Sequence, residues 1–258
     1  MPKLHRDGVA IHYEVHGTNL HKDRPTLLLS HGYSWTCRMW DGQIAALKDR
    51  YQVVVWDMRG HGESDYPTDP GLYSEALTVG DMAALLDEVG AKKAVIGGLS
   101  LGGYMSLAFT ASHPDRVRAL MLFDTGPGFK KDEARAQWNE TARQRAATFD
   151  SRGLAALNGR DEKITRHRDA SGLAGAARGM LAQQGDRVIQ SLDKVAVPTL
   201  VLVGANDTPF LAATDYMAGK IRNAIKVVLA EAGHGANMDQ PEYFNRAVEA
   251  FLARLPAA

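Results

Sequence analysis

The stretch of sequence that decides the fold reads Ala94-Val95-Ile96-Gly97-Gly98-Leu99-Ser100-Leu101-Gly102-Gly103. An apolar run begins it and the helix-compatible residues 104–109 follow it, so the stretch predicts a strand, a sharp turn and a helix. A serine with glycine two residues before and two after it is typical of a nucleophile elbow, in which a strained turn presents the hydroxyl above the sheet edge. Glycine at these two positions lets the strand and the helix pack closely. Ser100 is therefore a candidate nucleophile, although a glycine-rich turn of this kind can also be purely structural.

Composition and charge narrow the class of protein. The chain has 258 residues, of which 45% are hydrophobic and 23% are charged, so we expect a soluble globular protein with one core and an insertion. Lys and Arg together number 30, as do Asp and Glu, so no net field favours nucleic acid or an anionic membrane as a partner. No apolar run approaches the ~20 residues of a membrane span, and the N-terminus lacks the apolar core of a signal peptide.

Cysteine usage and the missing phosphate-binding and metal-binding motifs argue against a disulfide, a bound nucleotide and a metal site. The single cysteine, Cys37, cannot form an internal disulfide and lacks the paired spacing of a zinc site. The chain also contains no G-x-G-x-x-G, Walker-type or H-E-x-x-H motif. We therefore expect no cofactor, no metal and a cytoplasmic location.

The order of elements predicts an α/β fold. Residues 9–15 alternate after Asp7-Gly8, which predicts an antiparallel hairpin at the start. Short continuous apolar runs then alternate with helical segments such as Val79–Val89 and Tyr243–Leu255, so we expect a mainly parallel sheet covered on both faces. The predicted strands are Thr26–Leu29, Val53–Trp56, Ala94–Ile96, Ala119–Phe123, Thr199–Val203 and Lys226–Leu229.

The segment 126–194 breaks this alternation. It shows no convincing strand but has helical stretches rich in alanine and arginine, interrupted at Gly153, Gly159, Gly172 and Gly185. Between Lys130 and Lys194 there are 13 Lys and Arg residues against nine Asp and Glu residues. We interpret the segment as a small, basic helical cap, most of whose arginines are simply solvated.

A serine nucleophile needs a base and an acid beside it. Histidine is the usual base, and His234 is the strongest of the nine candidates because it follows the last predicted strand, at the carboxyl edge of the sheet. The base needs a carboxylate that fixes its tautomer. Asp207 and Asp124 both follow predicted strands, and we prefer Asp207 because it completes the order Ser, Asp, His. Either aspartate could instead cap a turn, and His234 could be a surface residue.

Two backbone N–H groups are candidates for an oxyanion hole, which must stabilise the charge of a tetrahedral intermediate. Leu101 offers one because it follows Ser100 at a helix N-terminus, where the dipole favours negative charge. The other comes from the loop Ser30-His31-Gly32-Tyr33-Ser34-Trp35, in which we predict Tyr33 as the donor. Gly32 would let the backbone approach a ligand, and an ordinary turn is the alternative interpretation.

These motifs resemble the α/β-hydrolase family over essentially the whole chain. Besides the elbow and His31-Gly32, the sequence Asp57-Met58-Arg59-Gly60-His61-Gly62-Glu63-Ser64-Asp65 is similar to the D-x-R-G-x-G-x-S loop of these enzymes. The resemblance implies a mostly parallel eight-stranded sheet with helices on both faces, a core of residues 1–125 and 195–258, and a helical cap insertion of residues 126–194. It also implies that the 57–65 loop shapes the site entrance.

The resemblance, together with the serine at the nucleophile position, implies a carboxylesterase-like hydrolase. Serine argues against the haloalkane dehalogenase and epoxide hydrolase branches, which use aspartate. We predict attack on a small ester, thioester or lactone, with Ser100, Asp207 and His234 as triad and the N–H groups of Tyr33 and Leu101 as oxyanion hole.

Other functions stay open. The Leu99-Ser100-Leu101 context resembles enol-lactonases, and a basic cap could attract a lactone that bears a carboxylate. Cofactor-free perhydrolases or haloperoxidases and carbon-carbon bond hydrolases share the triad. A hydrolase-like receptor for a small ligand is an alternative of a different class, which turnover would distinguish. The sequence indicates no oligomeric state.

Overall fold

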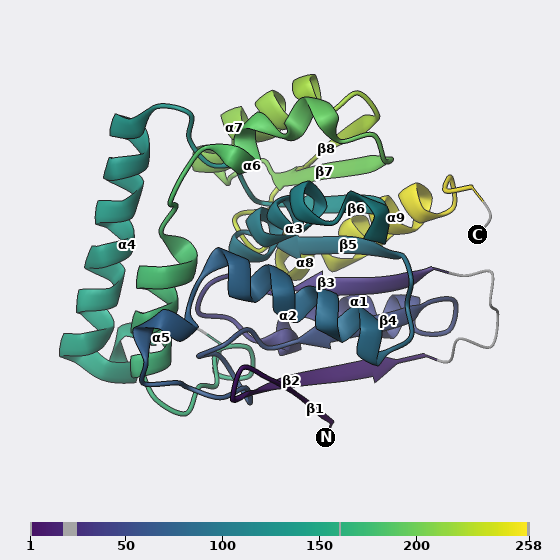
Figure 1. The fold of residues 1–258 in the computed structure, drawn as a ribbon. Helices are drawn as coiled ribbons and strands as arrows, with labels where there is room; N and C mark the ends of the chain where they lie inside the picture. Colours follow the sequence, from purple (N-terminus) through teal and green to yellow (C-terminus); the bar gives the residue numbers. More distant parts are fainter. Residues whose placement is uncertain (1, 18–24, 160, 257–258) are drawn as a thin grey trace.

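The computed structural model describes residues 2–17, 25–159 and 161–256. Within them an eight-stranded sheet has the order β1-β2-β4-β3-β5-β6-β7-β8 (Figure 1). β1 pairs antiparallel with β2, and β2 with β4, while all other neighbours are parallel. This confirms the predicted hairpin and the mainly parallel sheet. The strands are β1 (Lys3–Arg6), β2 (Val9–His16), β3 (Thr26–Ser30), β4 (Gln52–Trp56), β5 (Ala94–Leu99), β6 (Val117–Phe123), β7 (Thr199–Gly204) and β8 (Ala224–Leu229).

Helices cover both faces of the sheet, as predicted. Successive strand residues point to opposite faces, so Leu27 and Leu28 of β3 are both fully buried but belong to different hydrophobic clusters. One cluster includes side chains of α2 (Glu75–Glu88), α3 (Leu101–Ser112) and α7 (Thr208–Lys220). The other includes side chains of α1 (Asp41–Leu47), α8 (Ala236–Asp239) and α9 (Pro241–Leu252).

Local chemistry moves the boundaries of two predicted helices. α2 begins four residues before the predicted Val79, because the Ser74 hydroxyl accepts a hydrogen bond from Leu77 N at 3.1 Å and caps the helix there. α9 begins at Pro241, a residue suited to the first helical position, and it ends at Leu252. The sequence predicted a longer helix because its apolar stripe runs on to Leu255. This side chain does pack on the same core, although the helix has already ended.

The chain between β6 and β7 is helical in its described residues, as predicted. It contains α4 (Asp132–Arg152), α5 (Ser171–Ala176) and α6 (Arg187–Gln190), and α4 and α5 lie side by side beyond one end of the sheet (Figure 1). The boundaries of a cap at 126 and 194 stay a prediction. Shorter helical turns of the chain are η1 (Cys37–Trp40), η2 (Pro70–Leu72), η3 (Pro114–Arg116), η4 (Gly153–Leu157), η5 (Ala177–Leu181) and η6 (Leu192–Lys194).

Gly172 does not interrupt a helix, contrary to the sequence prediction, but lies inside α5. A Cβ atom at this position would lie 2.7 Å from Gly60 Cα and 2.3 Å from the ring of Tyr66. The glycine therefore serves close packing of α5 on the 57–65 loop. Gly153, by contrast, ends α4 with a positive φ of 58°, as a helix-terminating glycine does.

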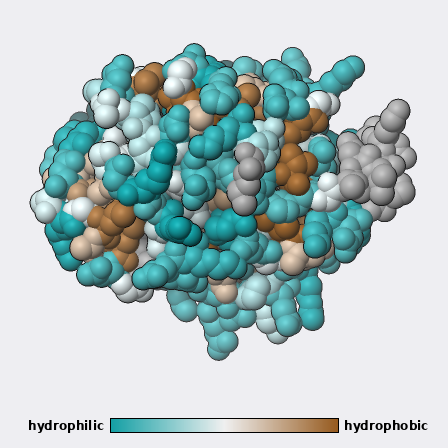
Figure 2. All heavy atoms as spheres, turned by 90° about the horizontal axis from the view of Figure 1, so that it is seen from below, coloured by the Kyte–Doolittle hydropathy of each residue, from teal (hydrophilic) through white to brown (hydrophobic). Residues whose placement is uncertain are grey.

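The face of the molecule on the side of β1 and β2 is mostly hydrophilic, with apolar atoms in small separate groups (Figure 2). Val15, Val228 and Tyr243 are the large apolar side chains that are exposed among the described residues, and such single residues are ordinary on a protein surface. Within the described ranges, no helix has the length and apolar character needed to cross a bilayer.

Candidate active site

Ser100 occupies the sharp turn between β5 and α3. Its φ of 55° and ψ of −116° are strained for a residue with a side chain. Its carbonyl oxygen accepts a hydrogen bond from Thr125 Oγ1 at 2.6 Å, which helps to hold the turn. A Cβ atom added to Gly102 would lie 2.2 Å from Ser30 O. A Cβ atom added to Gly98 would lie 2.4 Å from the carbonyl carbon of Gly102. The two glycines are therefore needed where the strand, the turn and the helix approach one another.

His234 and Asp207 meet at the carboxyl ends of β7 and β8. His234 Nδ1 lies 2.9 Å from Asp207 Oδ2, so Nδ1–H donates to the carboxylate and Nε2 is left to act as a base. The imidazole is stacked on Phe210, with ring centroids 5.1 Å apart, and lies near Trp35 on loop 30–35 at 5.9 Å. Asp207 is buried, at 5% exposed, whereas the His234 side chain is partly exposed.

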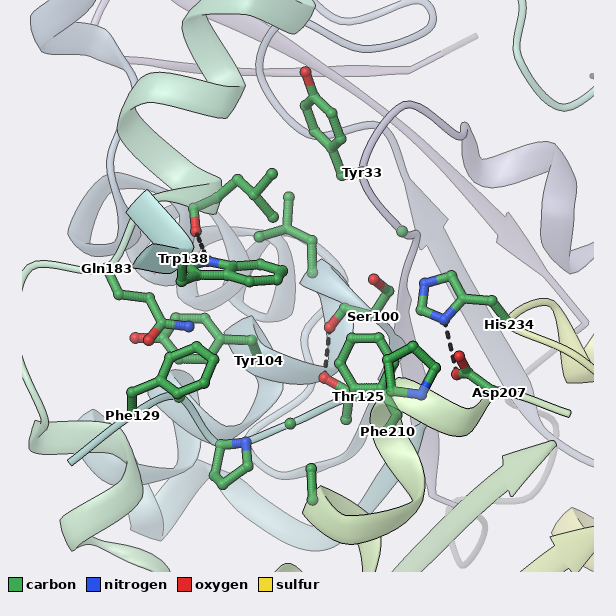
Figure 3. Close-up of a pocket in the computed structure, with 18 of the residues that line it drawn as sticks. Tyr33, Ser100, Tyr104, Thr125, Phe129, Trp138, Gln183, Asp207, Phe210 and His234 are labelled. Carbon is green, nitrogen blue, oxygen red and sulfur yellow. Dashed lines mark hydrogen bonds and ion pairs between the residues drawn. The ribbon is translucent and has the colours of Figure 1, made fainter. Parts of the chain in front are cut away.

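A cavity of about 590 Å³ brings together all five site residues predicted from the sequence. Ser100, Asp207, His234, Tyr33 and Leu101 line it, and Figure 3 shows the His234 ring turned toward Ser100. In the described residues no hydrogen bond joins the Ser100 hydroxyl to His234, and bonds of this kind often tighten only when a substrate binds. The volume suits a small molecule.

Asp124, the rival acid, does not line the cavity. It is fully buried, and its carboxylate accepts hydrogen bonds from Gly204 N at 2.8 Å and Ala236 N at 3.2 Å. Burial raises the pKa of Asp124 to about 8, although the bond from Gly204 opposes this shift. Its two bonds tie the end of β7, which leads to Asp207, to the loop that carries His234. The geometry therefore favours a supporting position for this carboxylate.

The two predicted oxyanion donors flank Ser100, one at the start of α3 and one on the loop after β3. Leu101 is the first residue of α3, where the N–H groups have no acceptor within the helix. Tyr33 follows β3, and its hydroxyl donates to Leu173 O in α5 at 2.9 Å. Both residues line the cavity.

Two buried histidines hold the backbone of Ser34, the residue after Tyr33. Ser34 has a positive φ of 61°; its N–H donates to His61 Nε2 at 3.2 Å, and its carbonyl accepts from His167 Nε2 at 3.1 Å. Burial lowers the pKa of His61 well below its usual value, as do the neighbouring histidines. No residue of the 57–65 loop is among those that line the cavity, and through His61 this loop holds the Tyr33 segment; its role at the site entrance stays a prediction.

The walls of the cavity were largely missed by sequence reasoning. They are aromatic, and two polar side chains of the insertion, Gln183 and Arg145, also line them. Nothing in the sequence marks these positions, because they meet only when α4 packs against the chain that follows α5. Of the aromatic residues, Tyr33 and Trp35 stood in a loop that the sequence had singled out; the others are Tyr104, Phe129, Trp138 and Phe210.

One buried group of possible metal ligands lies outside this cavity. Ligand atoms of His12, Cys37 and Asp57 lie within 4.8 Å of one another. Both carboxylate oxygens of Asp57 already accept backbone N–H bonds, from Cys37 at 2.7 Å and from Glu63 at 2.9 Å, and burial raises the pKa of the Cys37 thiol far above its usual value. The group is therefore engaged in holding loops, and it fits a metal poorly.

Comparisons with known proteins agree with this architecture. The sequence model of a family described as the alpha/beta hydrolase fold matches residues 25–160. A curated relative, 3-oxoadipate enol-lactonase 2 of Acinetobacter baylyi, is 31% identical over 261 residues, which cover 95% of this chain and 94% of that protein. Among solved structures, the enol-lactonase from Burkholderia xenovorans LB400 has a TM-score of 0.80 at 27% identity and covers 98% of this chain and 100% of its own. A thermophilic esterase from Thermogutta terrifontis has a TM-score of 0.82 at 28% identity and covers 99% of both chains.

Proposed function

This chain belongs to the α/β-hydrolase family, and from that premise we propose that it is a serine hydrolase that cleaves small carboxylic esters. The observation that carries the proposal is the 2.9 Å contact between His234 Nδ1 and Asp207 Oδ2, in the same cavity as the strained Ser100. In this proposal Ser100 is the nucleophile, His234 the general base and Asp207 the group that fixes the tautomer of His234.

Acylation begins when Ser100 Oγ attacks the ester carbonyl carbon and its proton passes to His234 Nε2. The carbonyl oxygen becomes an oxyanion, which the N–H groups of Leu101 and Tyr33 stabilise; one such donor is typically worth ~10²–10³ in rate. The intermediate then collapses, the bond to the alcohol oxygen breaks, and His234 Nε2–H protonates the departing alcohol.

Deacylation repeats these steps with water. His234 Nε2 takes a proton from a water molecule as its oxygen attacks the acyl-enzyme carbonyl, again through an oxyanion at the same two N–H groups. Collapse releases the carboxylic acid, and His234 returns its proton to Ser100 Oγ. The cycle therefore needs no group beyond these residues and water.

Replacement of the nucleophile tests the proposal. Ser100→Ala should remove hydrolysis of p-nitrophenyl acetate, with a loss of up to ~10⁶ in kcat, and labelling by a fluorophosphonate, which loses fluoride as it bonds to the serine oxygen. Ser112→Ala, the same change at the exposed far end of α3, is the matched control and should keep both. Hydrolysis of p-nitrophenyl acetate by Ser100→Ala at the full rate would refute the proposal. Stoichiometric labelling of the unchanged protein with no turnover on any ester would instead favour the receptor function.

Lactone hydrolysis is a second candidate, because both the curated relative at 31% identity and a solved structure at 27% identity are named enol-lactonases. The same steps open a lactone, with the difference that the leaving oxygen stays attached to the acyl chain. A panel of acetate, butyrate and octanoate esters, enol-lactones and a peroxide assay would rank ester, lactone and peroxide chemistry. We further propose that residues 126–194 act as a cap over the site; the cytoplasmic location stays a prediction.

A further inference from the structure

The wall of the cavity near α4 has polar side chains of two kinds. Tyr104, Trp138 and Thr125 each donate their polar hydrogen to a protein acceptor, at distances between 2.6 and 2.8 Å. Gln183 and Arg145 differ, since no hydrogen bond or ion pair of the described residues uses either side chain, although both line the cavity. These two side chains are therefore the groups available to a ligand at this wall.

Gln183 is held in place by its backbone. Asn139 of α4 accepts a hydrogen bond from Gln183 N and donates one to Gln183 O, both at 2.8 Å. Next to it, Trp138 Nε1 donates to Leu181 O at 2.8 Å. Gln183 is only 7% exposed, so an unpartnered amide is fixed inside a wall that is otherwise largely aromatic. Native proteins seldom leave a buried amide without a partner.

The amide presents its nitrogen to a ligand. Its Oε1 atom is fully buried without a partner, on the side where Gly128 packs so closely that an added Cβ atom would lie 2.8 Å from it, so a ligand meets the other end of the amide. Figure 3 shows Nε2 directed toward Tyr104 and the interior of the cavity. Arg145, exposed on the same helix as Trp138, also offers only donors. A matching ligand therefore carries an acceptor.

The position of Gln183 relative to Ser100 decides which part of the substrate it meets. In the proposed reaction His234 protonates the leaving alcohol, so the leaving group lies on the His234 side of Ser100. Figure 3 places Gln183 on the other side of Ser100. In the proposed reaction that side is left for the acyl chain. We propose that Gln183 Nε2 binds an oxygen acceptor, a ketone or carboxylate oxygen, on the acyl chain of the substrate. This inference rests on the proposed function.

The test compares two p-nitrophenyl esters of nearly equal shape, the 4-oxopentanoate and the 4-methylpentanoate. The ratio of their kcat/KM values should fall about tenfold in Gln183→Met, because one hydrogen bond to the ketone oxygen is lost. Comparison of ratios between variants cancels the different chemical reactivity of the esters. Gln144→Met makes the same change on the exposed face of α4 and should leave the ratio as in the unchanged protein. The mono-p-nitrophenyl ester of glutaric acid, with Arg145→Met, distinguishes an anionic acceptor from a neutral one.

If the kcat/KM ratio of the 4-oxopentanoate to the 4-methylpentanoate ester is the same in the unchanged protein and in Gln183→Met, the inference is overturned. A failure of the proposed function looks different, because none of the esters would then be turned over and Ser100 would not be labelled. In that case binding of free 4-oxopentanoate and 4-methylpentanoate to the protein, measured by calorimetry, still decides: a preference for the oxo acid that Gln183→Met removes supports the subsite, and no preference rejects it.

Discussion

Asparagine in place of Asp207 should disable catalysis while the fold survives. The Asp207 carboxylate accepts the proton on His234 Nδ1 at 2.9 Å. An asparagine can turn its NH₂ group to Nδ1, which selects the tautomer protonated at Nε2, and that tautomer cannot take the proton of Ser100. A change of this kind lowers kcat by about 10⁴ in serine hydrolases with the same arrangement. We expect Asp207→Asn to lose about this factor on p-nitrophenyl acetate.

Asp124→Asn is the matched control, for which we expect a loss of stability and only a small loss of kcat. The two carboxylate oxygens of Asp124 accept hydrogen bonds from the N–H groups of Gly204 and Ala236. The amide oxygen of an asparagine can accept only one of these bonds, and its NH₂ group then faces the other N–H group. One buried N–H left without an acceptor costs on the order of 1–3 kcal/mol of unfolding free energy. Each kcal/mol lowers Tm by about 2–4 °C in a chain of this size. Asp124→Asn should therefore melt earlier and keep far more of its kcat.

The assay is steady-state kinetics on p-nitrophenyl acetate together with thermal unfolding of the unchanged protein and both variants. Circular dichroism at the assay temperature shows that each variant is folded when its rate is measured. A larger loss of kcat in folded Asp124→Asn than in Asp207→Asn would refute the assignment of the acid. It would make Asp124 the partner of the base in place of Asp207.

Two further predictions concern stability. Gly102→Ala would put a methyl group 2.2 Å from Ser30 O, a backbone atom that cannot move aside, and should lower the unfolding free energy by about 1–3 kcal/mol or more in urea; an unchanged urea midpoint would contradict this. His61 has a lowered pKa because it is buried, so below pH ~6.5 the unfolded chain binds a proton that the folded chain does not, and stability should fall as the pH drops. His61→Gln should flatten that decline, and equal pH dependence of the urea midpoint in both proteins would rule out His61 as its cause.

The sequence predicted those parts of the site that depend on local chemistry. Ser100 could be found because its turn requires glycines at fixed distances, and those glycines do meet backbone atoms. His234 and Asp207 could be found because parallel strands end at one edge of the sheet, so residues that follow two neighbouring strands come together. Asp124 follows a strand in the same way, and the structure distinguishes it from Asp207 by its buried bonds to Gly204 and Ala236, where Asp207 contacts His234.

The substrate-binding wall could not be predicted for a physical reason. Trp138 and Gln183 lie 45 positions apart in a segment without strands, and their meeting depends on how α4 packs against the chain that follows α5. A different tertiary contact, that of α5 with the 57–65 loop, explains the error at Gly172, where the sequence shows a helix breaker but the structure uses the missing side chain for contact with Gly60. Tertiary contact overrides local preference at such positions.

The bond from His167 to Ser34 has a consequence for anyone who would redesign this protein. His167 belongs to the chain between β6 and β7, whereas Ser34 adjoins the N–H group proposed to receive the oxyanion. An exchange of that chain for the equivalent segment of another hydrolase, made to change which acyl groups fit, would also remove a group that holds Ser34. Selectivity and turnover therefore cannot be exchanged as separate modules, and a transplanted segment has to bring its own donor for the Ser34 carbonyl.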